Sequence, residues 1–310
     1  MKKLPSKNCD LNELKNFCDV NFIITDIDGT LIKGDEMVFQ QVQVINNKKK
    51  SEFRFKWGRV LMTIATGRTY YGAHKVMEEL NIQRGIPLVL YNGAVIIAYQ
   101  TNELLFQKTI SKFFIRRLEA ALNLNNEYFL MYIMEMRKDV FQSAEEVVVE
   151  KVYGIGKQSI SVDVNGLEII WNDVLGDNLI EPCSILINKS ILSAESKEKV
   201  HQVLETAKEI EYTDSGNGFI EICGNGVNKG IVFDVLREKR PFLIKKSLAI
   251  GDNDNDCELL KAADIGVAVA NGSRCAKEVA DYICEHEGAA GVLDVMNTLK
   301  NANKYWGNRK

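Results

Sequence analysis

The sequence predicts a doubly wound α/β protein with a separate α+β module inserted into its middle. The length of 310 residues suits two domains better than one. Short apolar runs alternate with helical patterns near both ends of the chain, which is typical of a parallel sheet covered by helices on both faces. The middle of the chain is more polar. We therefore expect a discontinuous core formed by 1–108 and 213–310, with the inserted module at 109–212.

The strands and helices expected in the core follow one another as β-α-β units. Each expected strand is a short apolar run that ends in polar or glycine-rich residues. The strands are expected at 22–25, 60–65, 87–91, 247–250 and 265–270, and the helices at 70–80, 228–237, 257–262 and 274–280.

The middle of the chain mixes helices with strands of moderate polarity, which favours an α+β module. Helices are expected at 112–122 and 194–208, and strands at 129–134, 167–171 and 184–188. The basic run at 46–59 is interpreted as a solvated loop or helix face.

Composition and charge exclude several classes of protein. Hydrophobic residues make up 46% and charged residues 26% of the chain, which excludes disordered and collagen-like proteins. The 39 Lys and Arg against 42 Asp and Glu give a net charge of −3. This balance predicts neither a nucleic-acid nor a membrane partner, and no protein partner is implied. An anionic ligand must therefore be held by local groups.

The distribution of apolar residues and cysteines favours a cytoplasmic protein. Polar residues such as Asn8 and Asp10 stand where a signal peptide needs an apolar stretch. The apolar runs are shorter than the ~20 residues of a membrane span. The seven cysteines are scattered and never spaced as Cys-x-x-Cys, so we expect neither a disulfide framework nor a zinc site.

Two carboxylates follow the first core strand, in the segment Asp26-Ile27-Asp28-Gly29-Thr30. Ligands of open α/β sheets bind at this end of the strands. A turn at Gly29 lets one carboxylate attack a substrate while the other transfers a proton. Because Asp26 and Asp28 repel, either a divalent cation lies between them or one is protonated. The alternative is a turn that uses Asp and Gly only for their backbone preferences.

A second acidic cluster, 251–256, follows the strand expected at 247–250. Two strands of one sheet therefore end in carboxylates, and hard oxygen ligands in this number favour Mg2+ with a substrate phosphate. A calcium loop is excluded, because Cys257 and Ala263 stand where such a loop needs Gly and Glu.

Two further segments suit a phosphate. Thr66-Gly67-Arg68 offers a hydroxyl and backbone N–H groups at the start of a helix, although Thr66 can equally be an ordinary helix cap. The segment 224–230 is rich in glycine but matches neither common nucleotide-binding pattern. Lys229 is therefore interpreted as a lone cation beside the carboxylates, the alternative being a solvated surface lysine.

Taken in order, four of these segments resemble the motifs of the haloacid dehalogenase superfamily. They are Asp26-Ile-Asp-Gly-Thr, Thr66-Gly-Arg, Lys229-Gly and Gly251-Asp-Asn-Asp-Asn-Asp. Tyr91-Asn92-Gly93-Ala94 and Gly266-Val-Ala-Val-Ala-Asn271 are similar to segments of the Cof-type phosphatases in that superfamily. The resemblance implies a Rossmann-like core and identifies the inserted module as an α/β cap that determines substrate specificity.

The resemblance also implies roles for the matching residues. Asp26 is expected to be the nucleophile that forms an aspartyl-phosphate, and Asp28 the general acid and base. Mg2+ would be held by the carboxylate of Asp26, the backbone carbonyl of Asp28 and the carboxylate of Asp252. The residues expected to bind the substrate are Gly29, Thr66, Gly67, Asn92, Lys229 and Asn255, of which Thr66 and Lys229 are also catalytic. Asp256 and Asn271 are expected to support the site.

The expected function is therefore a Mg2+-dependent phosphatase of small phosphorylated metabolites, with sugar phosphates as the leading class. One alternative is a phosphomutase or phosphotransferase of the same superfamily. The other is a non-catalytic sensor of a phosphorylated ligand. Two segments depart from the family pattern: 34–58 is longer and more basic than usual, and Val269-Ala-Asn-Gly272 replaces Met-Gly-Asn-Ala.

Overall fold

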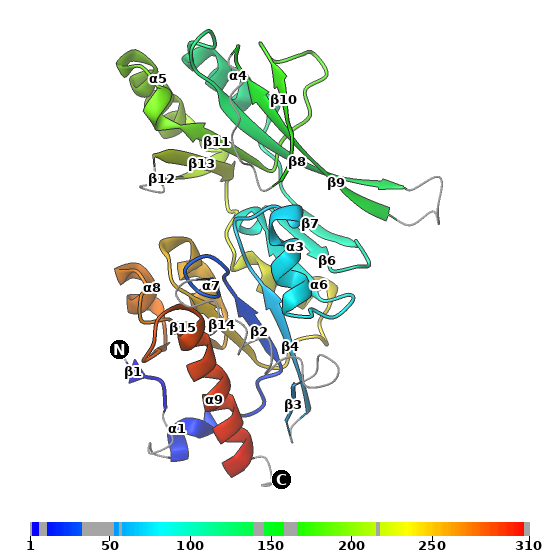
Figure 1. Cartoon of the computed structure of the whole chain (residues 1–310), viewed down its shortest axis with the longest axis vertical. Helices are drawn as coiled ribbons and strands as arrows, with labels where there is room; N and C mark the ends of the chain where they lie inside the picture. The colour runs from blue at the N-terminus through cyan, green and yellow to red at the C-terminus, as the bar shows by residue number, and fades with distance from the viewer. Residues whose placement is uncertain are drawn as a thin grey trace. The chain divides into compact units, whose positions relative to one another are not determined.

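A computed structural model of the chain describes residues 2–5, 11–32, 53–55, 58–138, 146–157, 166–214 and 218–306. The chain forms two compact units (Figure 1). The first contains 1–67, 73–101 and 228–310, and the second contains 68–72 and 102–227. Most of the basic run at 46–59 lies outside the described residues.

The first unit is built around a seven-stranded sheet in the order β1-β16-β15-β14-β2-β4-β3. Every neighbouring pair runs parallel except β3 and β4, which are antiparallel. The predicted α/β class with a parallel sheet is therefore confirmed. The strands are β1 (Lys2–Lys3), β2 (Phe22–Thr25), β3 (Phe53–Phe55), β4 (Gly58–Ile64), β14 (Ser247–Gly251), β15 (Ile265–Ala268) and β16 (Tyr282–Ile283).

Helices connect these strands and supply the apolar faces that bury the sheet. Every residue of β2, β14 and β15 is buried, as expected for central parallel strands. Helix α7 packs against β14 and β15, and α1 packs against α9 (Figure 1). The helices are α1 (Leu11–Lys15), most of α3 (Tyr70–Glu79), α6 (Ile231–Lys239), α7 (Cys257–Ala262), α8 (Arg274–Val279) and α9 (Gly288–Trp306).

The strand expected at 87–91 differs from the prediction, because it joins the parallel sheet through a single β-bridge and pairs mainly with another strand. β5 (Pro87–Leu90) pairs antiparallel with β6 (Val95–Ala98). A single parallel bridge joins Val89 to Ala65, just after β4. The turn between β5 and β6 is the 3-10 helix η1 (Tyr91–Gly93), and all three of its residues have positive φ. This hairpin determines where Asn92 lies.

The second unit contains a six-stranded sheet in the order β10-β9-β8-β11-β13-β12. Its strands are antiparallel except for the parallel pair β9 and β10. The strands are β8 (Phe129–Lys138), β9 (Glu146–Ile155), β10 (Ile169–Asn172), β11 (Ser184–Asn188), β12 (Ile210–Asp214) and β13 (Phe219–Gly224). The unit also contains β7 (Leu104–Gln107) and the 3-10 helix η2 (Lys189–Ile191).

Two long helices of the second unit, α4 (Lys112–Ala121) and α5 (Ala194–Thr206), pack against each other. Each begins at a serine N-cap, Ser111 or Ser193, whose hydroxyl accepts a hydrogen bond from the backbone three residues on. Their apolar faces bury one face of the sheet. On the opposite face, the rings of Tyr128 and Trp171 meet edge to face, with centroids 5.3 Å apart. The unit is thus an α+β module.

The second unit is longer than the predicted insertion of 109–212, since it extends from 102 to 227. The difference at its end has a physical cause. β13 lies between β11 and β12 in the six-stranded sheet, and its residue Ile222 is buried among the apolar side chains beneath α4 and α5. The chain therefore leaves this unit only after β13.

The sequence predicted no disulfide framework, but the structure contains one disulfide, between Cys257 and Cys275. Their separation of 18 residues gave no signal in the sequence. They come together because α7 and α8, which carry them, pack against each other. Within the described residues, no helix is both long and apolar enough to cross a membrane.

The turn at Gly93 provides a test of the packing in the first unit. A Cβ atom on Gly93 would lie 2.1 Å from the carbonyl oxygen of Asn228, and its φ of 104° already favours glycine. We expect Gly93→Ala to lower the free energy of unfolding by about 2–4 kcal/mol, through strain and overpacking together. Urea denaturation measures the change.

Gly85→Ala is the matched control for this prediction. Gly85 also has a positive φ, 82°, but a Cβ there would meet only Thr101 at 4.0 Å. Gly85→Ala should therefore lower the free energy of unfolding only by the backbone strain, about 1–2 kcal/mol. Equal losses in the two variants would show that the close approach to Asn228 is unimportant.

Candidate active site

The candidate site forms where two adjacent parallel strands of the first unit end. β2 ends at Thr25 and is followed by Asp26, while β14 ends at Gly251 and is followed by Asp252. Thr25 lies opposite Ile250 in the sheet, and the Asp26 backbone N–H donates to the Ile250 carbonyl at 2.9 Å. The strand register therefore brings the two predicted acidic clusters to the same edge of the sheet.

Lys229 joins two of these carboxylates in the interior of the first unit. It lies just before α6, and only 1% of its surface is exposed. Its Nζ is 2.6 Å from Asp26 Oδ1 and 2.6 Å from Asp256 Oδ1. Asp26 is 4% exposed and Asp256 is fully buried. Because each buried charge has an opposite partner, the arrangement avoids an isolated charge in the core.

Asp256 also orders the backbone of the acidic segment. Its second oxygen, Oδ2, accepts hydrogen bonds from the backbone N–H groups of Asp252 at 2.9 Å and Asn253 at 3.0 Å. Asn253 and Asp256 together form a capping box at the start of the 3-10 helix η3 (Asp254–Asp256). Both oxygens of Asp256 are therefore engaged, one by Lys229 and one by the loop that carries Asp252.

The burial of these charges changes their proton affinities. Burial raises the pKa of Asp26 to about 8, an effect that Lys229 opposes and that Asp256 and Asp252 add to. For Lys229, burial lowers the pKa, but the two hydrogen-bonded carboxylates outweigh it, so the pKa lies above the usual lysine value. Lys229 thus bonds two of the three carboxylates in the cluster, which leaves the cluster with an excess of negative charge.

Asp252 is held by groups from two other loops. Thr30 Oγ1 donates to Asp252 Oδ1 at 2.7 Å. The Asn271 side chain donates to the Gly29 carbonyl at 3.0 Å and contacts Asp252 Oδ2 at 3.5 Å. A Cβ atom on Gly29 would lie 2.2 Å from Asp252 Oδ2, so only glycine fits this position. The oxygen of Asn271 accepts from the backbone of Gly288, where α9 begins.

The predicted substrate-binding residues Thr66, Gly67, Asn92 and Asn255 lie beside one another. Thr66 is buried after β4, and its carbonyl accepts from the Asn92 backbone at 3.0 Å. The Asn255 side chain donates to Asn92 Oδ1 at 3.1 Å, while its own Oδ1 is buried without a hydrogen-bond partner. A Cβ on Gly67 would lie 3.1 Å from the Asn92 amide. These residues therefore place amide and hydroxyl groups next to the acidic cluster.

The chemistry of the acidic cluster fits a divalent cation. Oxygen atoms of Asp26, Asp252 and Asp256 lie within 4.8 Å of one another. These hard oxygen donors, with an excess of negative charge, are the ligands that Mg2+ prefers. Asp28 differs from the others because it is exposed. An exposed carboxyl group beside a buried one can exchange protons with a bound molecule.

Two residues that support the site were not singled out in the sequence analysis. One is Thr30, within the first acidic motif, whose hydroxyl holds Asp252. The other is Ser273, whose backbone N–H donates to the Asp252 carbonyl at 2.6 Å. Thr30 lies next to the predicted residues, but Ser273 is 21 positions from Asp252 and has no local signal beyond that of a helix cap.

Comparison with known proteins assigns this arrangement to a family. The sequence matches the haloacid dehalogenase-like hydrolase family over residues 23–296, which is most of the chain. The chain belongs to this family. The predicted resemblance is therefore confirmed, and hydrolases of this family generally use a divalent metal.

Relatives of known name or structure agree with this assignment. The chain is 24% identical over 278 residues to the 5-amino-6-(5-phospho-D-ribitylamino)uracil phosphatase YcsE of Bacillus subtilis, covering 90% of this chain and 95% of the relative. A haloacid dehalogenase-like hydrolase from Bacteroides thetaiotaomicron has a TM-score of 0.66 at 21% identity, covering 92% of this chain and 99% of that one.

The subclass IIB sugar phosphatase BT4131 has a TM-score of 0.63 at 18% identity, covering 91% of this chain and all of that one. Both solved structures share the fold. With the family membership and the full-length match to a phosphatase, this hydrolase is a phosphatase that acts on phosphorylated substrates.

The buried pairs of Lys229 can be tested by their effect on stability. Lys229→Met removes the ammonium group and leaves Asp26 and Asp256 buried without a counter-charge. We expect the free energy of unfolding to fall by about 3–5 kcal/mol, the usual cost of breaking a buried pair. Urea denaturation without divalent cations measures it.

Lys261→Met is the control, because Lys261 pairs with Glu258 on α7 where both side chains are half-exposed. Lys261→Met should lower the free energy of unfolding by less than about 1 kcal/mol. In the double variant Lys229→Met/Asp256→Asn, part of the loss should be recovered, since one buried charge is removed. Equal stability of Lys229→Met and Lys261→Met would contradict the account of the buried network.

Proposed function

We propose that the protein is a Mg2+-dependent phosphatase of small phosphorylated metabolites, with sugar phosphates as its substrate class, and that Asp26 forms an aspartyl-phosphate. The observation that carries the proposal is the pairing of Asp26 with Lys229 beside Asp252 at the end of β2. A nucleophilic carboxylate, a fixed cation and a second carboxylate are the groups that phosphoryl transfer needs.

In this proposal Asp26 attacks the phosphorus atom of the substrate. The bond between phosphorus and the leaving oxygen breaks, and Asp28 gives its proton to that oxygen. Asp28 then takes a proton from water, whose oxygen attacks the phosphorus of the aspartyl-phosphate and releases inorganic phosphate. The exposure of Asp28 supports this role, because both the leaving group and water must reach it.

Lys229 and the neighbouring amides and hydroxyl are proposed to hold the phosphoryl group. Lys229 offsets part of the negative charge on Asp26, to which it is bonded at 2.6 Å. Thr66, Gly67, Asn92 and Asn255 lie side by side and offer neutral donors, which suit phosphate oxygens. The buried Oδ1 of Asn255, which has no partner, is an acceptor, so it suits a hydroxyl group of a bound substrate rather than a phosphate oxygen.

The cation is proposed to be held by the carboxylates of Asp26 and Asp252 and by the backbone carbonyl of Asp28. Asp256 is the weaker ligand, since both its oxygens accept other hydrogen bonds. When bound, Mg2+ supplies the positive charge that lets an anionic carboxylate approach an anionic phosphate. Thr30 and Asn271 are proposed to fix the orientation of Asp252.

The substrate class rests on two relatives. YcsE is named for a substrate with a phosphorylated ribityl chain, and BT4131 is named as a sugar phosphatase. The second unit is proposed to select among such substrates, because all the residues with proposed catalytic or cation-binding roles lie in the first unit. Phosphate release across sugar phosphates, nucleotides, pyridoxal phosphate and phosphoamino acids would test this class, and conversion to an isomeric sugar phosphate would favour a mutase.

The role of Asp26 predicts the behaviour of Asp26→Asn. The change keeps the side-chain shape but removes the attacking charge and a proposed cation ligand. We expect the rate of phosphate release to fall by several orders of magnitude, as when other covalent catalysts are removed. Asp234→Asn, at an exposed position on α6, should retain the parent rate. A near-parental rate in Asp26→Asn would rule out this nucleophile.

The raised pKa of Asp26 predicts how cation binding depends on pH. Below its pKa of about 8, Asp26 holds a proton that must leave before the carboxylate can bind a cation. The affinity for Mg2+ should therefore rise by up to roughly tenfold per pH unit below that value and level off above it. Calorimetric titration with Mg2+ should also detect proton release near neutral pH. An affinity that does not change with pH in this range would refute the prediction.

A further inference from the structure

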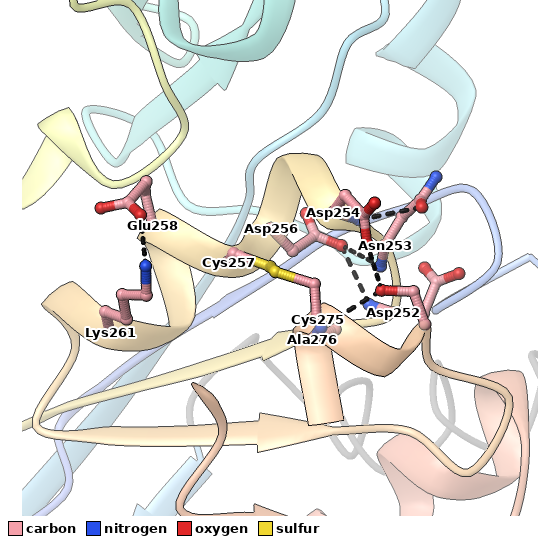
Figure 2. Close-up of a disulfide and its surroundings, with 10 residues drawn as sticks. Asp252, Asn253, Asp254, Asp256, Cys257, Glu258, Lys261, Cys275 and Ala276 are labelled. Atoms are coloured by element: carbon pink, nitrogen blue, oxygen red, sulfur yellow. Dashed lines mark hydrogen bonds and ion pairs between the residues drawn. A yellow bond between two sulfur atoms is a disulfide. The ribbon is translucent and has the colours of Figure 1, made fainter. Parts of the chain in front are cut away.

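The disulfide between Cys257 and Cys275 lies beside the segment that carries Asp252. Figure 2 shows it joining α7 to α8, next to Asp252, Asp254 and Asp256. Cys257 directly follows Asp256, the partner of Lys229. None of the roles proposed for catalysis uses either cysteine.

Two sets of contacts connect this disulfide to Asp252. On the side of Cys257, Asp256 accepts a hydrogen bond from the Asp252 backbone at 2.9 Å. On the side of Cys275, Ser273 donates from its backbone N–H to the Asp252 carbonyl at 2.6 Å. The Ser273 hydroxyl also donates to Asp254 at 2.5 Å and caps α8. The disulfide thus completes a closed ring of covalent and hydrogen bonds that includes Asp252.

We propose that this disulfide is a reversible redox switch that sets the affinity of the site for its divalent cation. The inference rests on the cation site proposed above. In the disulfide state, α7 and α8 are covalently joined and the segment between Asp252 and Asp256 is fixed at both ends. In the dithiol state that segment is held by hydrogen bonds alone. Because orientation of metal ligands by their surroundings contributes to affinity, reduction weakens cation binding.

A peroxide can oxidise the two thiols to the disulfide, and a dithiol can reduce the disulfide again. Oxidation by hydrogen peroxide converts the two thiols and one hydrogen peroxide molecule into the disulfide and two waters. In reduction, the thiolate of a dithiol attacks a sulfur of the disulfide, and the half-buried Cys275 is the more accessible one. The sulfur–sulfur bond breaks, Cys257 leaves as a thiolate that takes a proton, and the second thiol of the reductant releases Cys275. Two electrons pass from the reductant to the protein.

The test compares the full-length protein in its two states. Treatment with hydrogen peroxide or dithiothreitol, followed by thiol alkylation and peptide mass spectrometry, identifies the state of Cys257 and Cys275. The Kd for Mg2+ is then measured by calorimetry in metal-depleted buffer, since Asp254, Cys257 and Cys275 could bind a soft metal once reduced. We expect the disulfide form to bind Mg2+ roughly tenfold more tightly, the lower end of the effect of outer-shell contacts.

Variants distinguish this cysteine pair from the others. In Cys257→Ala/Cys275→Ala, the Kd should equal that of the reduced parent and should not respond to either reagent. Cys18→Ser and Cys223→Ser, at two further half-buried cysteines, should keep the full redox response. The comparison of the two states of the parent protein does not depend on whether any variant folds.

Two results would overturn the proposal. One is an equal Kd for Mg2+ in the two states, and the other is a failure of peroxide to form the Cys257–Cys275 disulfide. Both leave the proposed phosphatase function intact, because that function is measured by phosphate release. Absence of any Mg2+ binding would instead contradict the cation site itself, and with it both proposals.

Discussion

The buried bonds of Lys229 to Asp26 and Asp256 are the interaction on which the site depends. A lysine with 1% exposure is stable in the interior only because two carboxylates accept hydrogen bonds from it at 2.6 Å. The bond to Asp256 also reaches the backbone of Asp252 through the second oxygen of Asp256. One ammonium group therefore orders residues that come from three distant parts of the chain.

The same network explains why the site suits a cation and a phosphate. Three carboxylates lie within 4.8 Å of one another, and Lys229 bonds two of them. Burial raises the pKa of Asp26, so the folded protein holds these charges at a cost that a bound cation reduces. The burial of apolar residues in the core of the fold offsets that cost. β2 and β14 are buried along their whole length and place Asp26 and Asp252 at adjacent strand ends.

The sequence predicted the parts of the site that depend on local patterns. Short apolar runs before Asp26 and Asp252 identified two strands of one parallel sheet, and parallel strands place their ends at one edge. The segment 224–230 already suggested Lys229 as a cation beside the carboxylates, and the family resemblance supported it and identified Asp256. Other features depend on tertiary packing and left little signal. The sequence of β9 (Glu146–Ile155) does not alternate regularly between polar and apolar residues, so it gave no clear strand signal. The sequence of β5 is that of a buried core strand, although β5 forms a hairpin with β6. The pairing of Cys257 with Cys275 required the packing of α7 against α8.

If the phosphoryl group passes through Asp26 before it reaches water, the stereochemistry at phosphorus records it. A thiophosphate ester made chiral at phosphorus with two oxygen isotopes is hydrolysed in water labelled with the third isotope, and the configuration of the released thiophosphate is determined. Two successive in-line displacements, one by Asp26 and one by water, each invert the phosphorus. We therefore expect net retention of configuration, whereas net inversion would show direct attack by water and rule out the Asp26 intermediate.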